Sequence, residues 1–243
     1  MQIFLNTQHG EGKQESEDRV LVCQGTFEDS FTSMIRPNGI VAVADGVGGN
    51  NAGGQAADFV CSELAKIDEL NTEILQHINE LLLEKGGSDP KLAGMATTLS
   101  GLHVTLSGRT VYFHVGNTRI YAIQANHYLT QITRDDTVVD YLVRSGKLSE
   151  EEALVYPSRN EITACFGGGR TGLFKIVLKE LDSAKYTHFL ITSDGVHEHL
   201  TTDDMEDILD DANGDWAMSV KQLVENAKEN GSRDDCTAVI IAP

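Results

Sequence analysis

Three aspartates that are far apart in the sequence each lie beside a short apolar run and a turn. Asp45 and Asp194 follow such runs and precede a glycine, whereas Asp234 comes shortly before the run 238–242. A carboxylate at the end of a strand is held by a rigid element yet faces solvent, which suits a ligand of a divalent metal ion. The pattern predicts a metal centre assembled from distant segments.

Gly46, directly after the first aspartate, adds to this prediction. Glycine lets the backbone turn sharply and lets a carbonyl approach a ligand closely. A carboxylate and an adjacent carbonyl are a normal pair of hard oxygen ligands for Mg²⁺ or Mn²⁺. The alternative is an ordinary Asp-Gly turn at a strand end, which this motif alone favours. The glycines that follow have neither the spacing of a dinucleotide-binding loop nor the Gly-Lys-Ser/Thr of a P-loop.

Glu17 and Asp18 are further acidic candidates near the start of the chain. Carboxylates that converge repel one another, so a cluster of them implies bound cations. The formal charge of −18 argues against a nucleic-acid partner, because a phosphate backbone needs a basic footprint. It favours cations or a basic substrate, and a solubilising surface explains it equally well.

No apolar stretch is long enough for a membrane span, and the amino terminus lacks the pattern of a signal peptide. The four cysteines are scattered without Cys-x-x-Cys spacing, which indicates small buried hydrophobes in a reducing compartment. We therefore expect a cytoplasmic protein with no membrane partner.

Short β-rich runs alternate with amphipathic segments along the chain. Strands are expected at 19–24, 40–44, 99–105, 110–115, 120–124, 176–178, 189–192 and 238–242. Helices are expected at 53–67, 72–83, 137–145, 150–154, 203–211 and 216–229. The turn residues 106–109 and 116–119 predict hairpins, and hairpins build antiparallel sheet. The elements indicate an α+β fold in which helices cover sheets.

Seven short segments, taken in order, resemble the successive motifs of the metal-dependent protein phosphatases of type 2C in their bacterial form. They are Glu17-Asp18-Arg19, the run 43–49, Ala96-Thr97-Thr98-Leu99, His114–Arg119, the run 129–133, Leu190–Gly195 and Gly231–Thr237. The resemblance implies a four-layer αββα sandwich of two antiparallel sheets flanked by helices. It also implies one catalytic domain over 1–243 with a flap at about 136–160.

The resemblance also implies roles for individual residues. Asp45 would bridge two metal ions, and the Gly46 carbonyl would bind one of them. Asp194 and Asp234 would bind the other ion. The implied cofactors are two Mn²⁺ or Mg²⁺ ions, whose bound water would attack the phosphorus without a covalent phosphoenzyme.

Glu17 and Asp18 would act mostly through metal-bound waters.

Three positions depart from the family pattern. Lys13 replaces an arginine that grips phosphate, and lysine keeps the charge but loses the bidentate fork. An ordinary surface lysine is an equal alternative. Asn117 replaces an aspartate of a third, weak metal site, and a simple hairpin-turn asparagine is the preferred alternative. Asp235 replaces a common asparagine and adds a carboxylate.

The implied activity is hydrolysis of phosphoserine and phosphothreonine in phosphorylated proteins, opposing a Ser/Thr kinase that phosphorylates the same substrates. A regulatory relative that binds phosphoproteins without turning them over is the alternative, supported only by Lys13 and Asn117. A calcium-binding structural protein is a third class. It would require carboxylates at EF-hand spacing, and the sequence contains none.

Overall fold

A computed structural model describes residues 1–47, 52–168, 174–182, 185–186 and 188–242. The described strands form two sheets in which every strand pair is antiparallel. Gly48 and Gly49, at the end of the run 43–49, and Gly169 lie outside the described residues.

The larger sheet has the order β11-β6-β5-β7-β8-β12, with β2 beside β5 and β3 beside β2. Its strands are β2 (Asp18–Val22), β3 (Gly25–Phe27), β5 (Gly39–Val47), β6 (Ala96–Thr97), β7 (Leu99–Val104), β8 (Thr110–Val115), β11 (Phe166–Gly167) and β12 (Val177–Leu181). The predicted turn at 106–109 joins β7 to β8 as a true hairpin.

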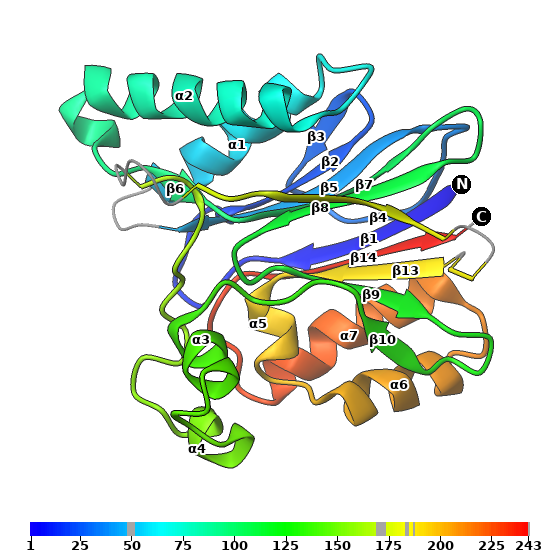
Figure 1. Cartoon of the computed structure of the whole chain (residues 1–243). Coiled ribbons are helices and arrows are strands. Elements are labelled where there is room, and N and C mark those ends of the chain that lie inside the picture. The colour runs from blue at the N-terminus through cyan, green and yellow to red at the C-terminus, as the bar shows by residue number, and fades with distance from the viewer. Residues whose placement is uncertain (48–51, 169–173, 183–184, 187, 243) are drawn as a thin grey trace.

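The smaller sheet has the order β10-β9-β13-β14-β1-β4. Its strands are β1 (Gln2–Gln8), β4 (Phe31–Ile35), β9 (Arg119–Ile123), β10 (Leu129–Gln131), β13 (His188–Thr192) and β14 (Cys236–Ala242). Strand β14 lies between β1 and β13, so segments from both ends of the chain meet in the middle of this sheet (Figure 1).

Helices cover the outer face of each sheet (Figure 1). The larger sheet is covered by α1 (Ala52–Leu64) and α2 (Thr72–Ser88), the latter followed by the short 3₁₀ helix η1 (Pro90–Leu92). The smaller sheet is covered by α6 (Thr202–Asp211) and α7 (Trp216–Glu229). The predicted four-layer αββα sandwich is thereby confirmed.

Helix α2 shows why these segments are helical. Asn71 caps its start by accepting a hydrogen bond from the Ile74 amide (2.9 Å), which satisfies one free donor of the first turn. Leu75, Ile78 and Leu82 then recur at helical spacing and are buried against the larger sheet.

Side chains alternate along the central strands between the inter-sheet core and the helical layers. On β5, Val41 and Val43 face the other sheet, whereas Ala42 and Ala44 face the helices. Asp45 continues the inward-facing series of Val41 and Val43. The inward-facing positions of β5 are therefore apolar in the core and acidic at the end of the strand.

The hairpin predicted at 116–119 is wrong. Strand β8 pairs with β7 and β12, whereas β9 pairs with β13 and β10, so residues 116–118 cross from one sheet to the other. Thr118 holds the crossing, since its hydroxyl lies 2.6 Å from that of Thr98 and its carbonyl accepts from the Ser100 hydroxyl at 2.6 Å.

Strands β1 and β4 were not predicted. In β1, Ile3 and Leu5 face the inter-sheet core and Phe4 faces the helices, so both faces are buried and no apolar–polar alternation marks the strand. Strand β4 is a mostly exposed edge strand, whose polar residues give little signal.

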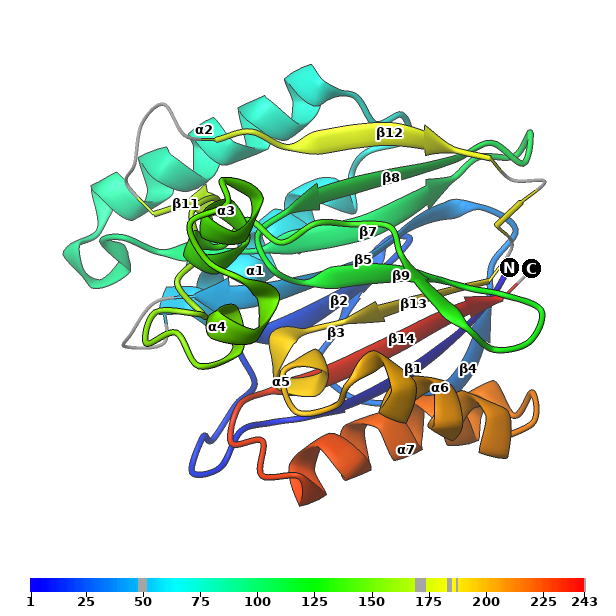
Figure 2. The same cartoon turned by 60° about the horizontal axis from the view of Figure 1, so that its bottom comes forward.

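Helices α3 (Val138–Arg144) and α4 (Glu150–Leu154) stand apart from the four layers at one end of the sandwich, beside α5 (Asp194–His197) (Figure 2). They confirm the two helices predicted for this segment. Both termini lie at the opposite end. Within the described ranges, no helix combines the length and apolar character that a bilayer crossing requires.

Candidate metal centre

Asp45 lies inside a strand, contrary to the predicted turn. Strand β5 continues to Val47 because Gly46 and Val47 pair with β6. On the other side, β2 pairs with β5 in a register that sets Asp18 opposite Asp45. Two carboxylates on neighbouring strands thus project at the same end of the larger sheet.

The Gly46 backbone packs directly on the start of α1. A Cβ on Gly46 would lie 2.2 Å from the Gly53 carbonyl carbon, so only glycine fits there. A Cβ on Gly53 would in turn lie 2.6 Å from the Gly46 carbonyl oxygen and 2.7 Å from Glu17 Oε1. The carbonyl oxygen of Gly46 and a carboxylate oxygen of Glu17 are therefore close neighbours beside Asp45.

Asp194 is the first residue of α5 and is not followed by the predicted turn. The next residue, Gly195, passes so close to the 234–235 segment that a Cβ on it would lie 2.0 Å from the Asp235 carbonyl oxygen. This contact joins the end of β13 to the loop before β14, as predicted from the aspartates of both segments. Asp234 lies in that loop, and its side chain is 58% exposed.

The aspartates are close enough for their charges to raise one another's pKa values. Burial and the charges of Asp194, Asp18 and Asp234 raise the pKa of Asp45 well above its usual value. Burial and then the charge of Asp234 raise the pKa of Asp194. For Asp18, burial raises the pKa to about 7, with the charge of Asp235 adding to the rise and the Thr237 and Ser193 hydroxyls opposing it.

Asn117 belongs to this cluster, although a simple hairpin-turn role was the preferred interpretation. It lies in the crossing between the sheets, only 3% exposed, and its Nδ2 donates to Asp194 Oδ2 at 2.9 Å. Its Oδ1 is buried and has no hydrogen-bond partner. A buried amide oxygen left unpaired is costly unless a ligand completes it.

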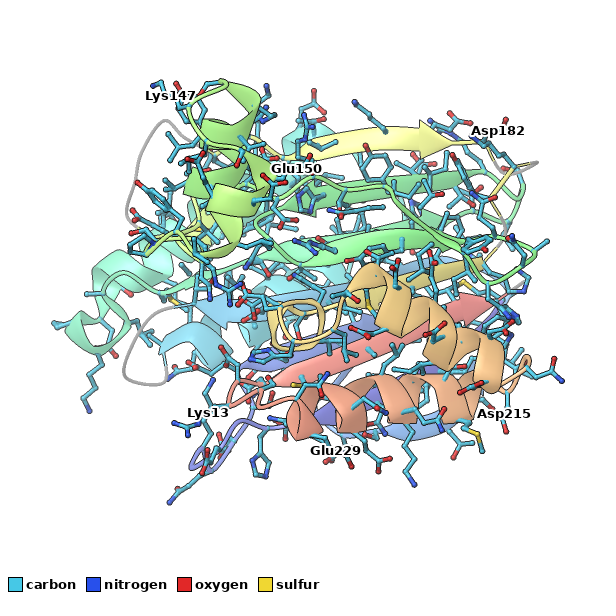
Figure 3. The ribbon with its side chains drawn as sticks, turned by 90° about the horizontal axis from the view of Figure 1, so that it is seen from below. Lys13, Lys147, Glu150, Asp182, Asp215 and Glu229 are labelled. Atoms are coloured by element: carbon cyan, nitrogen blue, oxygen red, sulfur yellow. The ribbon has the colours of Figure 1, made fainter. Side chains whose placement is uncertain are left out.

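Lys13 brings a positive charge to the rim of the cluster. Its ammonium contacts Asp235 Oδ2 at 2.8 Å, Asp234 Oδ1 at 3.0 Å and Glu17 Oε2 at 3.2 Å. Burial alone would lower the pKa of Lys13, but the hydrogen bonds to Asp235 and Asp234 outweigh it and raise this pKa. Lys13 lies at the same end of the molecule as the labelled flap residues Lys147 and Glu150 (Figure 3).

The acidic end is an open set of oxygens and not a closed cage. Among the described residues, no three His, Cys, Asp or Glu side chains are grouped closely enough to hold an ion by themselves. Mg²⁺ is usually bound by one or two carboxylates together with several waters, which such a set allows. Both carboxylate oxygens of Asp18 are also buried without a hydrogen bond of good geometry. These orphaned oxygens and the raised pKa values fit a site for divalent cations.

The end of the segment 136–160, which was predicted to be a flap, contacts a residue that follows Asp194. Asn160 donates to Glu198 Oε2 at 2.7 Å, and Arg159 lies 3.5 Å from the same oxygen. Burial, with the charge of Asp194 adding to it, raises the pKa of Glu198 to about 7. The base of the flap is tied to the sheet crossing, since Gly116 donates to the Asp136 carboxylate at 3.0 Å.

The role of Asp235 could not be assigned from the sequence. It is 3% exposed and accepts hydrogen bonds from the Gly10 amide at 2.7 Å and the Glu17 amide at 2.8 Å, in addition to the contact with Lys13. The alternation Asp235-x-Thr237-x-Val239 could have predicted that Asp235 points inward. Val239 faces the inter-sheet core, and every second residue back along the chain lies on the same side.

A sandwich of two antiparallel sheets that gathers carboxylates and a carbonyl oxygen at one open end defines a metal-dependent phosphatase fold. The chain belongs to the protein phosphatase 2C family, whose model matches residues 21–235.

Individual proteins are similar over almost the whole chain. A putative protein phosphatase 2C-type of Streptococcus pyogenes is 27% identical over 99% of this chain and 97% of its own. The serine/threonine protein phosphatase PstP of Mycobacterium tuberculosis is 30% identical over 92% of this chain, which spans only 43% of that protein's length. The PstP catalytic domain in complex with two manganese ions superimposes with a TM-score of 0.75 at 25% identity, covering 99% of this chain and 98% of that one.

Proposed function

We propose that this chain is a phosphoprotein phosphatase that hydrolyses phosphoserine and phosphothreonine with two Mn²⁺ or Mg²⁺ ions at its acidic end. The observation that carries the proposal is the meeting of Asp45, Asp18 and Asp194 at the open end of the sandwich, where burial and mutual charge raise their pKa values. Such a cluster needs cations at neutral pH. The manganese ions in the similar PstP structure support the identity of the metal.

Each residue then has a role. Asp45 would bind both ions, the Gly46 carbonyl one of them, and Asp194 and Asp234 the other. When bound, the ions lower the pKa of a water and neutralise the charge that develops on the phosphoryl oxygens. Asn117, with its free Oδ1, would serve at most a third, weakly held ion.

The residues around the ions would orient the reacting groups. Glu17 and Asp18 would accept hydrogen bonds from metal-bound waters, and the orphaned oxygens of Asp18 are available for this. Lys13 would meet a phosphate oxygen as a point charge at the solvent-facing rim. The flap at 136–160 would contact the protein substrate, because its docking on Glu198 places it beside Asp194.

We further propose a cytoplasmic enzyme whose partners are phosphorylated proteins and the Ser/Thr kinase that phosphorylates them. Cys23, Cys61 and Cys236 are free thiols, which suits a reducing compartment. The names of the similar Ser/Thr phosphatases support the substrate class.

The test is Mn²⁺-dependent release of p-nitrophenol from p-nitrophenyl phosphate, together with phosphate release from a phosphothreonine peptide. Asp45→Ala and Asp194→Ala should each lower kcat/KM by at least about 10²–10³-fold, the usual cost of removing one preorganised electrostatic group. Glu73→Ala removes an exposed carboxylate from the first turn of α2 and should leave the rate unchanged. A folded, Mn²⁺-loaded wild type that releases no product would overturn the proposal in favour of a phosphoprotein-binding module.

A further inference from the structure

Asp235 fixes the loop between β1 and β2 at three points. Its Oδ1 accepts from the Gly10 amide, and its Oδ2 accepts from the Glu17 amide and from the Lys13 ammonium, all within 2.8 Å. Gly10 and Glu17 stand on either side of Lys13 in the chain. One buried carboxylate therefore holds both arms of this loop and also the charged end of its lysine.

The three carboxylates around Lys13 are not equivalent. An ammonium group has three N–H donors, and here Glu17, Asp234 and Asp235 take one each. Glu17 and Asp234 are assigned above to the ions and their waters. Asp235 has no such assignment, and it is the most buried of the three, with the shortest contact.

The charges of Asp235 and Lys13 depend on each other. A buried carboxylate without a cation would be costly, and the ammonium together with two amides satisfies it. The Lys13 side chain remains 32% exposed, so its ammonium reaches the solvent-facing rim beside Asp234. A phosphate that approaches the acidic end meets this charge at the rim.

We infer that Asp235 is a positioning residue that holds Lys13 at the rim of the metal centre, where the ammonium binds the phosphate dianion of the substrate. The inference rests on the proposed function. Lys13 exchanges Asp234 and Glu17 for phosphate oxygens and keeps Asp235 as its anchor. Two of the departures from the family pattern, at positions 13 and 235, are in this way one coupled unit.

The experiment is a double-mutant cycle on the full chain with saturating Mn²⁺ and p-nitrophenyl phosphate. Lys13→Met should raise KM about tenfold, since a hydrogen bond to a charged group is lost, and should change kcat much less. Asp235→Asn should raise KM to a similar extent. The double variant should have nearly the KM of Lys13→Met alone, because both changes disable the same interaction. The inhibition constant of inorganic phosphate should rise in parallel.

A second variant covers the possibility that Asp235→Asn does not fold. Asp235→Glu keeps the charge but displaces it by one methylene group, and it should raise KM with kcat retained. The matched control is Glu180→Gln, which removes the carboxylate partner of Arg109 (2.8 Å) in an exposed pair. That change should leave KM and phosphate inhibition unchanged.

Wild-type KM in a folded Asp235→Asn or Asp235→Glu variant would overturn the inference, as would strictly additive effects of Lys13→Met and Asp235→Asn. A merely structural role of Asp235 would lower the melting temperature and the active fraction without moving the phosphate inhibition constant. These failures are distinct from failure of the proposed function, in which the wild type itself would show no Mn²⁺-dependent hydrolysis.

Discussion

The inter-sheet core and the acidic end are built by the same strands but bury their side chains in opposite ways. In the core, Val20, Val43 and Leu102 are at most 1% exposed and pack against one another. At the acidic end, Asp18 is equally buried but has no hydrogen bond of good geometry to either of its oxygens. Apolar burial stabilises the fold, whereas buried like charges oppose it. The core therefore supplies the stability of the fold, and the acidic end lowers that stability because its carboxylates are placed to bind cations.

The comparison is tested most strongly by Leu102→Ala in the middle of the core. Leu102 is fully buried on β7, so its truncation should lower the free energy of unfolding by about 2–5 kcal/mol. The loss should be the same with Mn²⁺ and with EDTA, because the cavity lies away from the carboxylates. Urea unfolding under both conditions measures it. A loss that appears only in EDTA would show that core and acidic end are not separate.

Metal binding at the acidic end should raise the free energy of unfolding, whereas Leu102→Ala lowers it. Mn²⁺ at 100 times its dissociation constant should raise the free energy of unfolding by about 2.7 kcal/mol, since it binds the folded state only. Thermal melts over a Mn²⁺ titration, reversed by EDTA, give this value. A melting temperature that does not respond to Mn²⁺ would contradict the assignment of the centre.

Asp45→Asn should then separate stability from activity. In EDTA the variant should be more stable than the wild type by about 0.5–2 kcal/mol, the usual range for a stabilising substitution, because one of the repelling charges is gone. It should also lose most of the stabilisation by Mn²⁺ and most of the hydrolysis. Comparison of the two melting temperatures in EDTA checks this, and a less stable variant would refute it.

The smallest effect concerns pH in the absence of metal. The folded-state pKa values of Asp18 and Glu198 are raised to about 7, above those of free carboxyl groups. The folded state therefore takes up protons as the pH falls from about 8 to 6.5, and its stability should rise by at most about 1.4 kcal/mol per pH unit for each proton. Below about 6.5 the buried His197, whose pKa is lowered chiefly by burial, opposes this rise.

Urea unfolding in EDTA at pH 8 and 6.5 measures the slope. Asp18→Asn should reduce the slope to the share of Glu198, whereas Leu102→Ala should lower stability equally at both pH values. With excess Mn²⁺ the share of Asp18 in this rise should disappear, because protons and cations compete for its oxygens. A slope of the opposite sign in the EDTA-treated wild type would contradict the raised pKa values.

Much of the fold could be predicted from local patterns. The stripe of Leu75, Ile78 and Leu82 located α2, and the turn at 106–109 located the β7–β8 hairpin. The turn at 116–119 misled, because a tight turn between two strands usually joins neighbours in one sheet. Here the packing of two sheets against each other decides which strands pair with β8 and β9. A short stretch of sequence around the turn carries no information on that packing.

The site was predictable to the extent that it lies on strands. The alternation Val41-x-Val43-x-Asp45 indicates an inward-facing carboxylate, although the end of β5 was placed too early. The tie between Lys13 and Asp235 joins residues 222 positions apart, and no local pattern indicates it. Such contacts depend on the packing of β14 beside β1.

The central place of β14 has a consequence for how the protein is made. This strand lies between β1 and β13, and the two aspartates that precede it reach Lys13 and Asp194. A growing chain on the ribosome can form the larger sheet early but cannot close the smaller one until residues 234–242 have emerged. Activity towards phosphoproteins should therefore be absent until residues 234–242 have left the exit tunnel.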